Sequence, residues 1–222
     1  LKNPGGTCLY WGCIPSKAYL HVVKLLNETK EAPNWGVEFG KPKIDLEKLR
    51  SFKEKVVAEN TGGTGQLVKQ RKINYIQGKA EFKDSETLSI TKVDGDKEEL
   101  KFEKAILATG SVPTVIPSLS IDSPRIMDST DALELEDIPD RLLVIGGGII
   151  GMELGSVYAA LGSKVTVVEL LPSLLPGADK DLVNVFQKSI EDKFEKILLK
   201  TKVSKLVDTG NSIKVNLEGE NI

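Results

Sequence analysis

Residues 142–169 carry the pattern that most restricts how this 222-residue chain can fold. Residues 142–145 are apolar without interruption, as in a strand of a parallel sheet that is buried on both faces. Residues 152–161 are predicted to form a helix that Gly162 ends, and residues 164–168 resume a β-branched strand. A strand, a helix and a second strand in this order form a βαβ unit, so the segment predicts an α/β fold.

A glycine-rich turn with G-x-G-x-x-G spacing joins the first of these strands to the helix. Gly146 is expected to make the tight turn, Gly148 to let the backbone approach a pyrophosphate, and Gly151 to let helix and strand pack closely. The helix N-terminus would hold the phosphate charge. Such spacing alone is weak evidence for a nucleotide site. Here, however, the predicted strands and helix lie at the expected positions around the glycines. The sequence therefore predicts that a dinucleotide binds the turn Gly146-Gly147-Gly148-Ile149-Ile150-Gly151.

Glu169 ends the second strand, at the distance from the glycines expected of an acid that binds a ribose. Its carboxylate can accept hydrogen bonds from both ribose hydroxyls of NAD. The 2′-phosphate of NADP would meet like-charge repulsion there, and residues 170–173 include no arginine to offset it. The sequence therefore favours NAD over NADP.

Cys8 and Cys13, the only cysteines, lie in the run G-G-T-C-L-Y-W-G-C-I-P-S-K, residues 5–17. In a regular α-helix, Cα atoms five residues apart are separated by roughly 8 to 9 Å, whereas a disulfide needs less than about 7 Å. A bridge therefore requires a break in the helix, which Gly12 and Pro15 permit. A short constrained loop and a nearby helix N-terminus suggest a disulfide that opens and closes.

Three other interpretations of the cysteine pair can be compared with the residue counts. A closed zinc site needs four ligands, and plant-type iron–sulfur spacing needs two further cysteines. The chain has two cysteines and a single histidine, His21, so no metal is expected. A pair of buried, unreactive cysteines is the remaining alternative, which the flanking residues disfavour.

Residues 5–17 resemble the redox-disulfide signature of the flavin-dependent pyridine nucleotide–disulfide oxidoreductases. Within this family, the run C-I-P-S-K at residues 13–17 is similar to the branch that oxidises dihydrolipoamide. Glutathione and trypanothione reductases usually carry a second lysine where this chain has Ser16. Mercuric reductases typically carry valine in place of Ile14, and the expected NAD preference disagrees with the NADP preference of glutathione reductases.

The resemblance implies catalytic roles for four residues. Cys8 would exchange with the substrate sulfur, and Cys13 would lie against the flavin and hold the charge-transfer thiolate. Lys17 and Glu153 would form an ion pair near the flavin N5 edge. Without the resemblance, Glu153 would be read as an acid on a helix surface.

The resemblance also implies FAD and NAD as cofactors. Gly78 matches a family glycine at the adenine end of FAD, and Ala108-Thr109-Gly110-Ser111 matches a segment that passes close to FAD at the end of a strand. Val203 matches a position whose backbone lies beside the adenine of NAD. A simple strand-to-loop exit would explain the second match, and bulk packing would explain the valine.

The predicted fold class is α/β, with Rossmann-like FAD- and NAD-binding domains of the two-dinucleotide-binding flavoprotein type, truncated at both ends. Residues 1–139 are expected to be part of the FAD-binding domain, without its first βαβ unit, and residues 140–222 the N-terminal part of the NAD-binding domain. The family's interface domain supplies a histidine–glutamate acid–base pair that this chain lacks. His21 is predicted to be a helix-surface or packing residue.

For the parent protein, the resemblance implies oxidation of dihydrolipoamide, presented on a lipoyl domain of a 2-oxoacid dehydrogenase or glycine cleavage complex, with reduction of NAD. A homodimer is expected, and the fragment alone is expected to lack turnover. The alternatives are a mercuric or other NAD(P)H-dependent disulfide reductase and, in another class, a non-catalytic NAD-binding or thiol-sensing module.

Charge and hydropathy restrict the partners. The formal charge is −2, and the sequence pI is about 5.7, with acidic and basic residues interspersed. These values give no electrostatic case for nucleic acid or an anionic membrane. No leader and no apolar run approaching about 18 residues is visible, so the cytoplasm is the expected location.

The remaining segments are assigned from periodicity and turn signals. A helical hairpin is expected from a helix that ends near Leu26 and a second one that Asp45 caps, with an interruption at the glycines of residues 61–65. The other assignments are strands at residues 74–82, 87–93 and 99–107, a domain connection at 113–139, a helix at 180–193, and a hairpin turn at 208–211.

Overall fold

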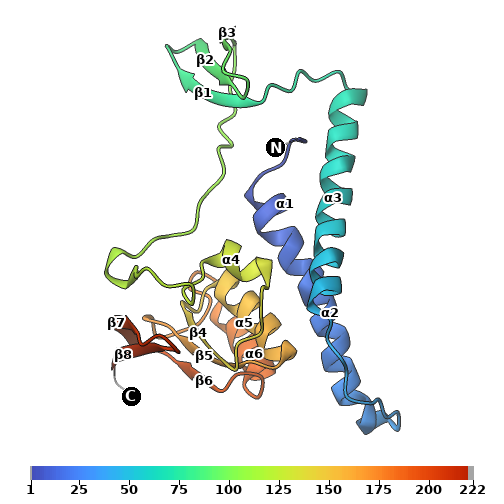
Figure 1. The fold of residues 1–222 in the computed structure, drawn as a ribbon, viewed down its shortest axis with the longest axis vertical. Coiled ribbons are helices and arrows are strands. Elements are labelled where there is room, and N and C mark those ends of the chain that lie inside the picture. Colours follow the sequence, from blue (N-terminus) through green and yellow to red (C-terminus); the bar gives the residue numbers. More distant parts are fainter. Residues whose placement is uncertain (1, 220–222) are drawn as a thin grey trace.

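The computed structural model describes residues 2–219, and its elements fall into a helical hairpin, a small antiparallel sheet and an α/β unit (Figure 1). The α-helices are α1 (Thr7–Trp11), α2 (Cys13–Glu31), α3 (Leu46–Gln70), α4 (Ser129–Glu134), α5 (Ile149–Leu161) and α6 (Lys180–Ile190). The strands are β1 (Gly78–Phe82), β2 (Thr87–Lys92), β3 (Lys97–Lys101), β4 (Arg141–Ile145), β5 (Lys164–Val168), β6 (Lys196–Leu198), β7 (Thr201–Asp208) and β8 (Ile213–Gly219). Short 3₁₀ turns cover Ala32–Trp35 and Pro117–Leu119.

The predicted βαβ unit is confirmed. Strands β4 and β5 pair in parallel, with Arg141 opposite Lys164 and Ile145 opposite Val168, and β6 continues the sheet on the far side of β5. Helix α5 begins at Ile149, earlier than predicted, and Gly162 ends it at φ 125°. The parallel sheet and its crossover helix place the glycine turn at the carboxyl end of β4.

Burial of β4 on both faces was a wrong expectation. Residues 142–144 are only half-buried, and the side chain of Ile145 is 44% exposed. The described sheet has the order β4-β5-β6, so β4 is an edge strand while β5 is central. Accordingly Val165, Val167 and Val168 of β5 are almost fully buried.

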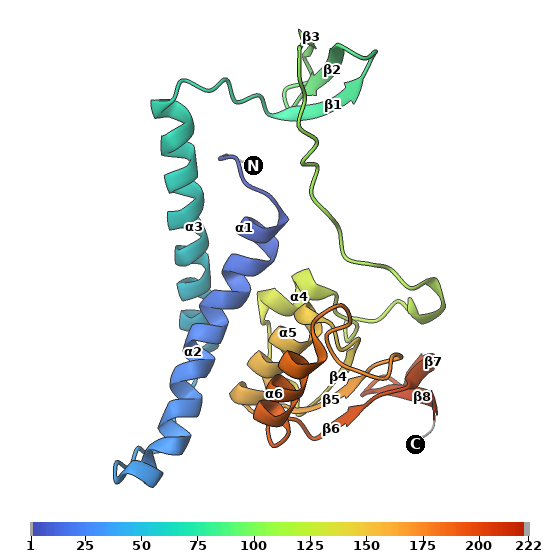
Figure 2. The ribbon, with the colours of Figure 1, turned by 180° about the vertical axis from the view of Figure 1, so that it is seen from behind.

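The helical hairpin is confirmed, although both helices are longer than predicted. Helix α2 runs to Glu31, and α3 begins where Asp45 accepts a hydrogen bond from the Lys48 backbone at 3.1 Å. Figure 2 shows α2 and α3 packed against each other, with a connection, residues 32–45, that leaves the lower end of α2 and runs back to the start of α3.

The expected interruption at residues 61–65 is wrong, because α3 continues through it to Gln70. A glycine in a helix costs about 1 kcal/mol relative to alanine, so propensity favours a break. Tertiary contacts oppose it: Thr61 and Gly65 are buried, and Asn3 packs where a Gly65 side chain would stand. The Thr61 hydroxyl also donates to the Ala58 carbonyl within the helix.

The antiparallel sheet β1-β2-β3 is shorter than the predicted strands. Pairing starts at Gly78, opposite Lys92, and β3 ends at Lys101, so residues 103–116 form no strand. Ile106 is 94% exposed and Val112 is 86% exposed. No strand of the described residues lies beside this segment. A high β-propensity alone does not make a strand, because a β-ladder needs a second strand to hydrogen-bond with. The prediction of a strand leading into Ala108 is therefore wrong here.

The C-terminal elements follow the sequence pattern with small shifts. Strands β7 and β8 pair in an antiparallel hairpin around the turn at residues 209–212, as predicted. Helix α6 ends at Ile190 rather than near 193, and the short strand β6 was not predicted. Residues 220–222 of the expected hairpin segment lie outside the described residues.

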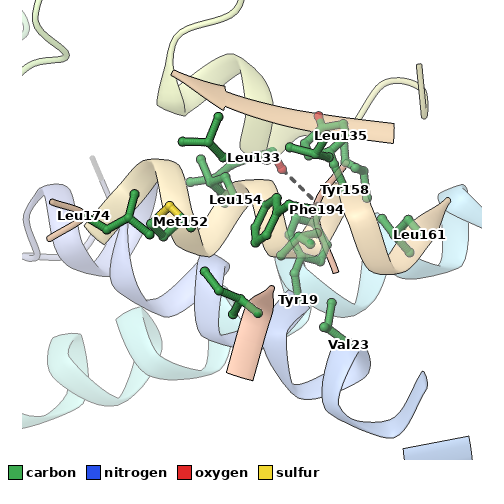
Figure 3. Packing of buried hydrophobic residues seen from close by; sticks show 14 of the residues in the cluster. Tyr19, Val23, Leu133, Leu135, Met152, Leu154, Tyr158, Leu161, Leu174 and Phe194 are labelled. Atoms are coloured by element: carbon green, nitrogen blue, oxygen red, sulfur yellow. Dashed lines mark hydrogen bonds between the residues drawn. The ribbon is translucent and has the colours of Figure 1, made fainter. Parts of the chain in front are cut away.

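One hydrophobic core joins the helical hairpin to the α/β unit. Tyr19 and Val23 of α2 pack in the same cluster as Met152 and Tyr158 of α5 and Phe194 beyond α6 (Figure 3). Both tyrosine hydroxyls donate to carbonyls in the last turn of α4: Tyr19 to Leu133 at 3.1 Å and Tyr158 to Ala132 at 3.0 Å. The end of α4, where helix carbonyls lack intrahelical partners, is thus capped from α2 and α5.

Replacement of Tyr158 by phenylalanine is expected to lower the free energy of unfolding by about 1 kcal/mol at neutral pH, because the Ala132 carbonyl loses its donor. Burial raises the pKa of Tyr158 from 10.0 to about 12. The unfolded chain therefore loses this proton first, so this stabilisation is present below pH 10 and is lost as pH rises from 10 to 12.

Urea unfolding between pH 7 and pH 12 measures both effects. The Tyr158→Phe variant should lose stability less steeply than the wild type between pH 10 and 12. A residual slope is expected because burial also raises the pKa of Tyr19. Identical alkaline slopes in the two proteins would contradict the assignment.

Candidate functional site

The run of residues 5–17, called the redox motif below, includes a break between two helices. Helix α1 ends at Trp11 and α2 begins at Cys13, with Gly12 at φ −144° and ψ −108° between them. This break brings the Cα atoms of Cys8 and Cys13 to 4.6 Å, and the two residues form a disulfide. The predicted departure from helical geometry is confirmed.

Gly12 is needed at this break because of a close approach. A Cβ at this position would lie 3.1 Å from the Thr7 carbonyl oxygen and 3.2 Å from the Cys8 Cα. Both cysteines are exposed, so an incoming thiolate has access to the bond. Cys13 is the first residue of a 19-residue helix, where the positive end of the dipole favours a thiolate. The arrangement suits a disulfide that opens by thiol exchange.

Lys17 and Glu153 form the predicted ion pair, which joins α2 to α5. Sequence reasoning missed a second contact: the buried Ser16 hydroxyl donates to the other carboxylate oxygen of Glu153 at 3.0 Å. The same hydroxyl lies 3.2 Å from the Cys13 carbonyl oxygen. Two neighbouring residues of α2 therefore fix both oxygens of one carboxylate, one helical turn after the disulfide.

Replacement of Ser16 by alanine is expected to lower the free energy of unfolding by about 1–2 kcal/mol, because Glu153 loses a charge-assisted hydrogen bond. A double-mutant cycle with Glu153→Gln, measured by urea unfolding, should give a coupling of at least about 0.5 kcal/mol. Ser163 offers a matched control, since its buried hydroxyl donates to the Pro139 carbonyl and does not touch Glu153. Additive effects of the Ser16 and Glu153 substitutions would contradict the contact.

The segment Ala108-Thr109-Gly110-Ser111 is irregular, yet the structure brings it to the redox motif. The Thr7 hydroxyl donates to the Ser111 carbonyl at 3.1 Å and accepts from the Ser111 backbone N–H at 3.2 Å. Gly110 has φ 81°, and a Cβ there would lie 3.1 Å from the Thr7 hydroxyl oxygen. These two bonds join Ser111 to Thr7, which immediately precedes Cys8 and lies 104 positions earlier in the chain. Sequence reasoning had not singled out Thr7.

The glycine turn has the features expected of a phosphate site. Gly146 has φ 109°, which makes the turn, and nothing lies within 4 Å of a Cβ built at Gly148. A Cβ at Gly151 would lie 2.2 Å from the Gly146 carbonyl oxygen and 3.0 Å from Val144 Cγ1 on β4, so helix and strand pack closely, as predicted. The exposed Ile149 and Ile150 open α5, and their backbone N–H groups have no partner within the helix. They are available for an anion.

Glu169 is at the predicted place but is more constrained than expected. Its side chain is 7% exposed, and each carboxylate oxygen accepts a backbone N–H at 2.7 Å, one from Gly147 and one from Leu171. Spacing alone could not reveal these bonds, because they depend on how residues 170–175 fold back. Each oxygen retains a lone pair for a further donor.

Two predicted cofactor positions lie away from the redox motif. Gly78 opens β1, in the small sheet at the top of Figure 1, and a Cβ there would lie 2.5 Å from the Thr91 carbonyl oxygen across the ladder. Val203 is buried on β7 with Val168 and Leu206. Their cofactor contacts stay predictions, and close packing gives both residues a structural reason.

Two further properties concern the described part of the chain. Among residues 2–219, no group of three or more histidine, cysteine, aspartate or glutamate side chains is placed to hold a metal ion. None of the helices found in that range is long and apolar enough to cross a bilayer.

A solvent-open disulfide at a helix start, together with a dinucleotide turn, is expected of an oxidoreductase that passes electrons between thiols and a nucleotide. The sequence profile of the pyridine nucleotide-disulphide oxidoreductases matches residues 1–222, and the chain belongs to this family. Its members are FAD-dependent oxidoreductases of pyridine nucleotides, so the predicted fold class and family are confirmed.

Curated relatives include dihydrolipoyl dehydrogenases. The chain is 48% identical over 216 residues to the protein from Haemophilus influenzae and 46% identical to that from Vibrio cholerae, in each case over 97% of this chain and 45% of the relative. A leghemoglobin reductase from Vigna unguiculata is 40% identical over 96% of this chain and 41% of its own length. The chain therefore spans less than half the length of these relatives.

Solved structures agree with this family. LpdA from Mycobacterium tuberculosis superposes with a TM-score of 0.85 at 26% identity, covering 98% of this chain and 48% of LpdA. The HOCl-induced flavoprotein disulfide reductase RclA from Escherichia coli, solved as a Cu(II) complex, gives a TM-score of 0.76 at 29% identity, covering 98% of this chain and 45% of RclA.

Proposed function

We propose that the protein carrying this chain is a dihydrolipoyl dehydrogenase, which oxidises dihydrolipoamide to lipoamide and reduces NAD. The observation that carries the proposal is the exposed Cys8–Cys13 disulfide at the start of α2. It lies in a chain that is 48% identical over 216 residues to a dihydrolipoyl dehydrogenase. Because the chain covers 45% of that relative, the activity is proposed for the longer protein.

The described residues fit the two cofactors of this reaction. The exposed segment 108–111 lies beside Thr7, immediately before Cys8, which suits a flavin next to the disulfide. Lys17, held by Glu153, would place a cation near the flavin, and Gly78 would contact its adenine end. NAD would occupy the turn of residues 146–151. When bound, FAD supplies the two-electron carrier between the dithiol and NAD.

The two cysteines would carry the thiol chemistry in separate roles. A thiolate of dihydrolipoamide attacks Cys8 Sγ, a mixed disulfide forms, and the bond to Cys13 breaks so that Cys13 leaves as a thiolate. The second substrate thiol releases its proton to solvent and, as a thiolate, attacks the substrate sulfur of the mixed disulfide. Lipoamide is released, Cys8 leaves as a thiolate, and the two substrate electrons remain on the cysteine pair.

The remaining site residues would support binding and orientation. Ser16 and Lys17 hold the Glu153 carboxylate and so join the disulfide helix to α5. Glu169 would accept hydrogen bonds from the adenosine ribose, and the Val203 backbone would lie beside the adenine. In this proposal, residues 1–139 belong to the FAD-binding domain and residues 140–222 to the NAD-binding domain.

The proposed partners follow from the substrate. Dihydrolipoamide would be presented on the lipoyl domain of a 2-oxoacid dehydrogenase or glycine cleavage complex, to a homodimer of the longer protein. A reducing compartment such as the cytoplasm suits a disulfide that must open in each turnover.

Steady-state assays of the longer protein test the proposal. NADH production from dihydrolipoamide and NAD should exceed NADPH production from dihydrolipoamide and NADP by at least about a hundredfold in kcat/KM, because the NADP phosphate would face Glu169. Consumption of NADPH with glutathione disulfide or Hg(II), in the absence of dihydrolipoamide activity, would instead assign the protein to another disulfide reductase branch.

A further inference from the structure

The carboxylate of Glu169 has a bonding pattern that recognition of a ribose does not explain. Both of its oxygens accept backbone N–H groups at 2.7 Å, from Gly147 in the glycine turn and from Leu171 in the next loop. We infer that Glu169 is a positioning residue for the phosphate-binding turn: its carboxylate holds Gly147 in place before any nucleotide arrives. The inference rests on the NAD site of the proposed function.

Gly147 is held on both sides of its peptide backbone. Its N–H donates to Glu169, and its carbonyl accepts the Leu175 N–H at 2.9 Å. A Cβ at Gly147 would lie 2.5 Å from Leu174 Cδ2 and 3.2 Å from the Glu169 Cβ. Leu174 is fully buried, so this contact belongs to the core. The loop of residues 170–175 therefore closes over the glycine turn, and Glu169 bonds to both.

Backbone hydrogen bonds to residues of the neighbouring chain segment fix the backbone of Glu169 itself. Its N–H donates to the Leu198 carbonyl at 2.8 Å, and its carbonyl accepts the Thr201 N–H at 2.9 Å. The carboxylate therefore extends from an anchored residue toward a turn whose other N–H groups, at Ile149 and Ile150, have no partner within the helix. Holding Gly147 aims these groups at an incoming pyrophosphate without a cost for ordering the turn during binding.

The Glu169 carboxylate can hold the turn and bind the ribose at the same time. Each carboxylate oxygen has two lone pairs, so one can accept a backbone N–H while the other accepts a ribose hydroxyl. A glutamine has a single acceptor oxygen and would place its NH₂ group against one of the two N–H donors. Removing the charge to admit NADP would therefore also loosen the turn that binds the pyrophosphate common to both nucleotides.

Amide hydrogen exchange of the longer protein without nucleotide tests this inference by residue-resolved NMR. In the wild type, the Gly147 and Leu171 amides should exchange at least about tenfold more slowly than the Ile149 and Ile150 amides. In Glu169→Gln, exchange of the Gly147 or Leu171 amide should accelerate by at least about tenfold, which corresponds to loss of one hydrogen bond. A Gly147 amide that exchanges in the wild type as fast as that of Ile149 would overturn the inference.

Two comparisons keep the experiment decisive. Glu195, which pairs with Arg141 at the start of β4, provides a control, because Glu195→Gln removes an ion-paired carboxylate at the end of the sheet away from the turn. The Glu195 variant should leave the Gly147 and Leu171 amides unchanged. The wild-type comparison needs no variant, so it stands even if Glu169→Gln does not fold.

Binding of an NAD analogue that lacks both hydroxyls of the adenosine ribose gives a second readout. If Glu169 positions the turn, Glu169→Gln should weaken this analogue as well as NAD. If the substitution leaves the analogue's affinity unchanged and weakens only NAD, ribose recognition is its sole role and the inference fails. Neither measurement uses dihydrolipoamide, so failure of the inference is distinguishable from failure of the proposed function.

Discussion

Replacement of Cys13 by serine in the longer protein is expected to reduce dihydrolipoamide oxidation by at least about a thousandfold. The physical reason is that serine cannot form the disulfide that Cys13 makes with Cys8, so the substrate thiols have no disulfide to reduce. Cys8→Ser should cause a loss of the same order, because the two sulfurs act as one unit and their effects do not add. Steady-state NADH formation measures both losses.

His21 supplies the control for this prediction. It is the only histidine of the chain and lies exposed on α2, one turn beyond Lys17. If it has no role in proton transfer, His21→Gln should retain activity within about twofold, while the cysteine variants lose theirs. Substantial activity in Cys13→Ser would contradict the relay through the cysteine pair.

Replacement of Gly151 by alanine is expected to destabilise the protein by about 2–3 kcal/mol. The added methyl group would lie 2.2 Å from the Gly146 carbonyl oxygen and 3.0 Å from Val144 Cγ1, so helix α5 would have to move away from the turn. For a chain of this size, the melting temperature should fall by roughly 5–10 °C. Differential scanning calorimetry measures the change.

Gly148→Ala provides the matched comparison on the same turn. A Cβ there meets no atom within 4 Å, and φ is −76°, so its stability cost should stay below about 1 kcal/mol. The methyl group would occupy the space that a pyrophosphate needs, so NAD affinity should fall at least tenfold, or about 1.4 kcal/mol. Equal melting temperatures for the two alanine variants would contradict the assigned roles of Gly148 and Gly151.

The parts of the fold that were predictable from the sequence are those that local geometry dictates. Gly146 at positive φ, the helix end at Gly162 and the cap at Asp45 follow from backbone and side-chain chemistry within a few residues. The helix break at Gly12 follows from the distance a disulfide permits.

The failures concern segments whose structure depends on distant partners. Helix α3 continues through residues 61–65 because Thr61 and Gly65 are buried and Asn3 packs against Gly65. The apolar run at residues 105–108 forms no strand, because no strand of the described residues lies beside it. The edge position of β4 depends on the order of strands in the sheet, which an apolar run does not reveal.

The candidate site shows the same division. The pairing of Lys17 with Glu153 was predictable only through the family resemblance, because the residues are 136 positions apart. Ser16 and Thr7 lie beside the cysteines in the run of residues 5–17. Their hydroxyl groups at these positions could have identified them as candidate hydrogen-bond donors. Their partners, at residues 153 and 111, required the structure.

An anaerobic titration of the longer protein with dihydrolipoamide, followed by flavin absorbance and NADH formation, tests the central claim most directly. The account predicts that substrate reduces the wild-type protein and that subsequent NAD yields one NADH per disulfide reduced. The Cys13→Ser protein should show no reduction by dihydrolipoamide while NADH still bleaches its flavin. Reduction of the Cys13→Ser flavin by dihydrolipoamide at the wild-type rate, or no response of the wild type to dihydrolipoamide, would contradict the account.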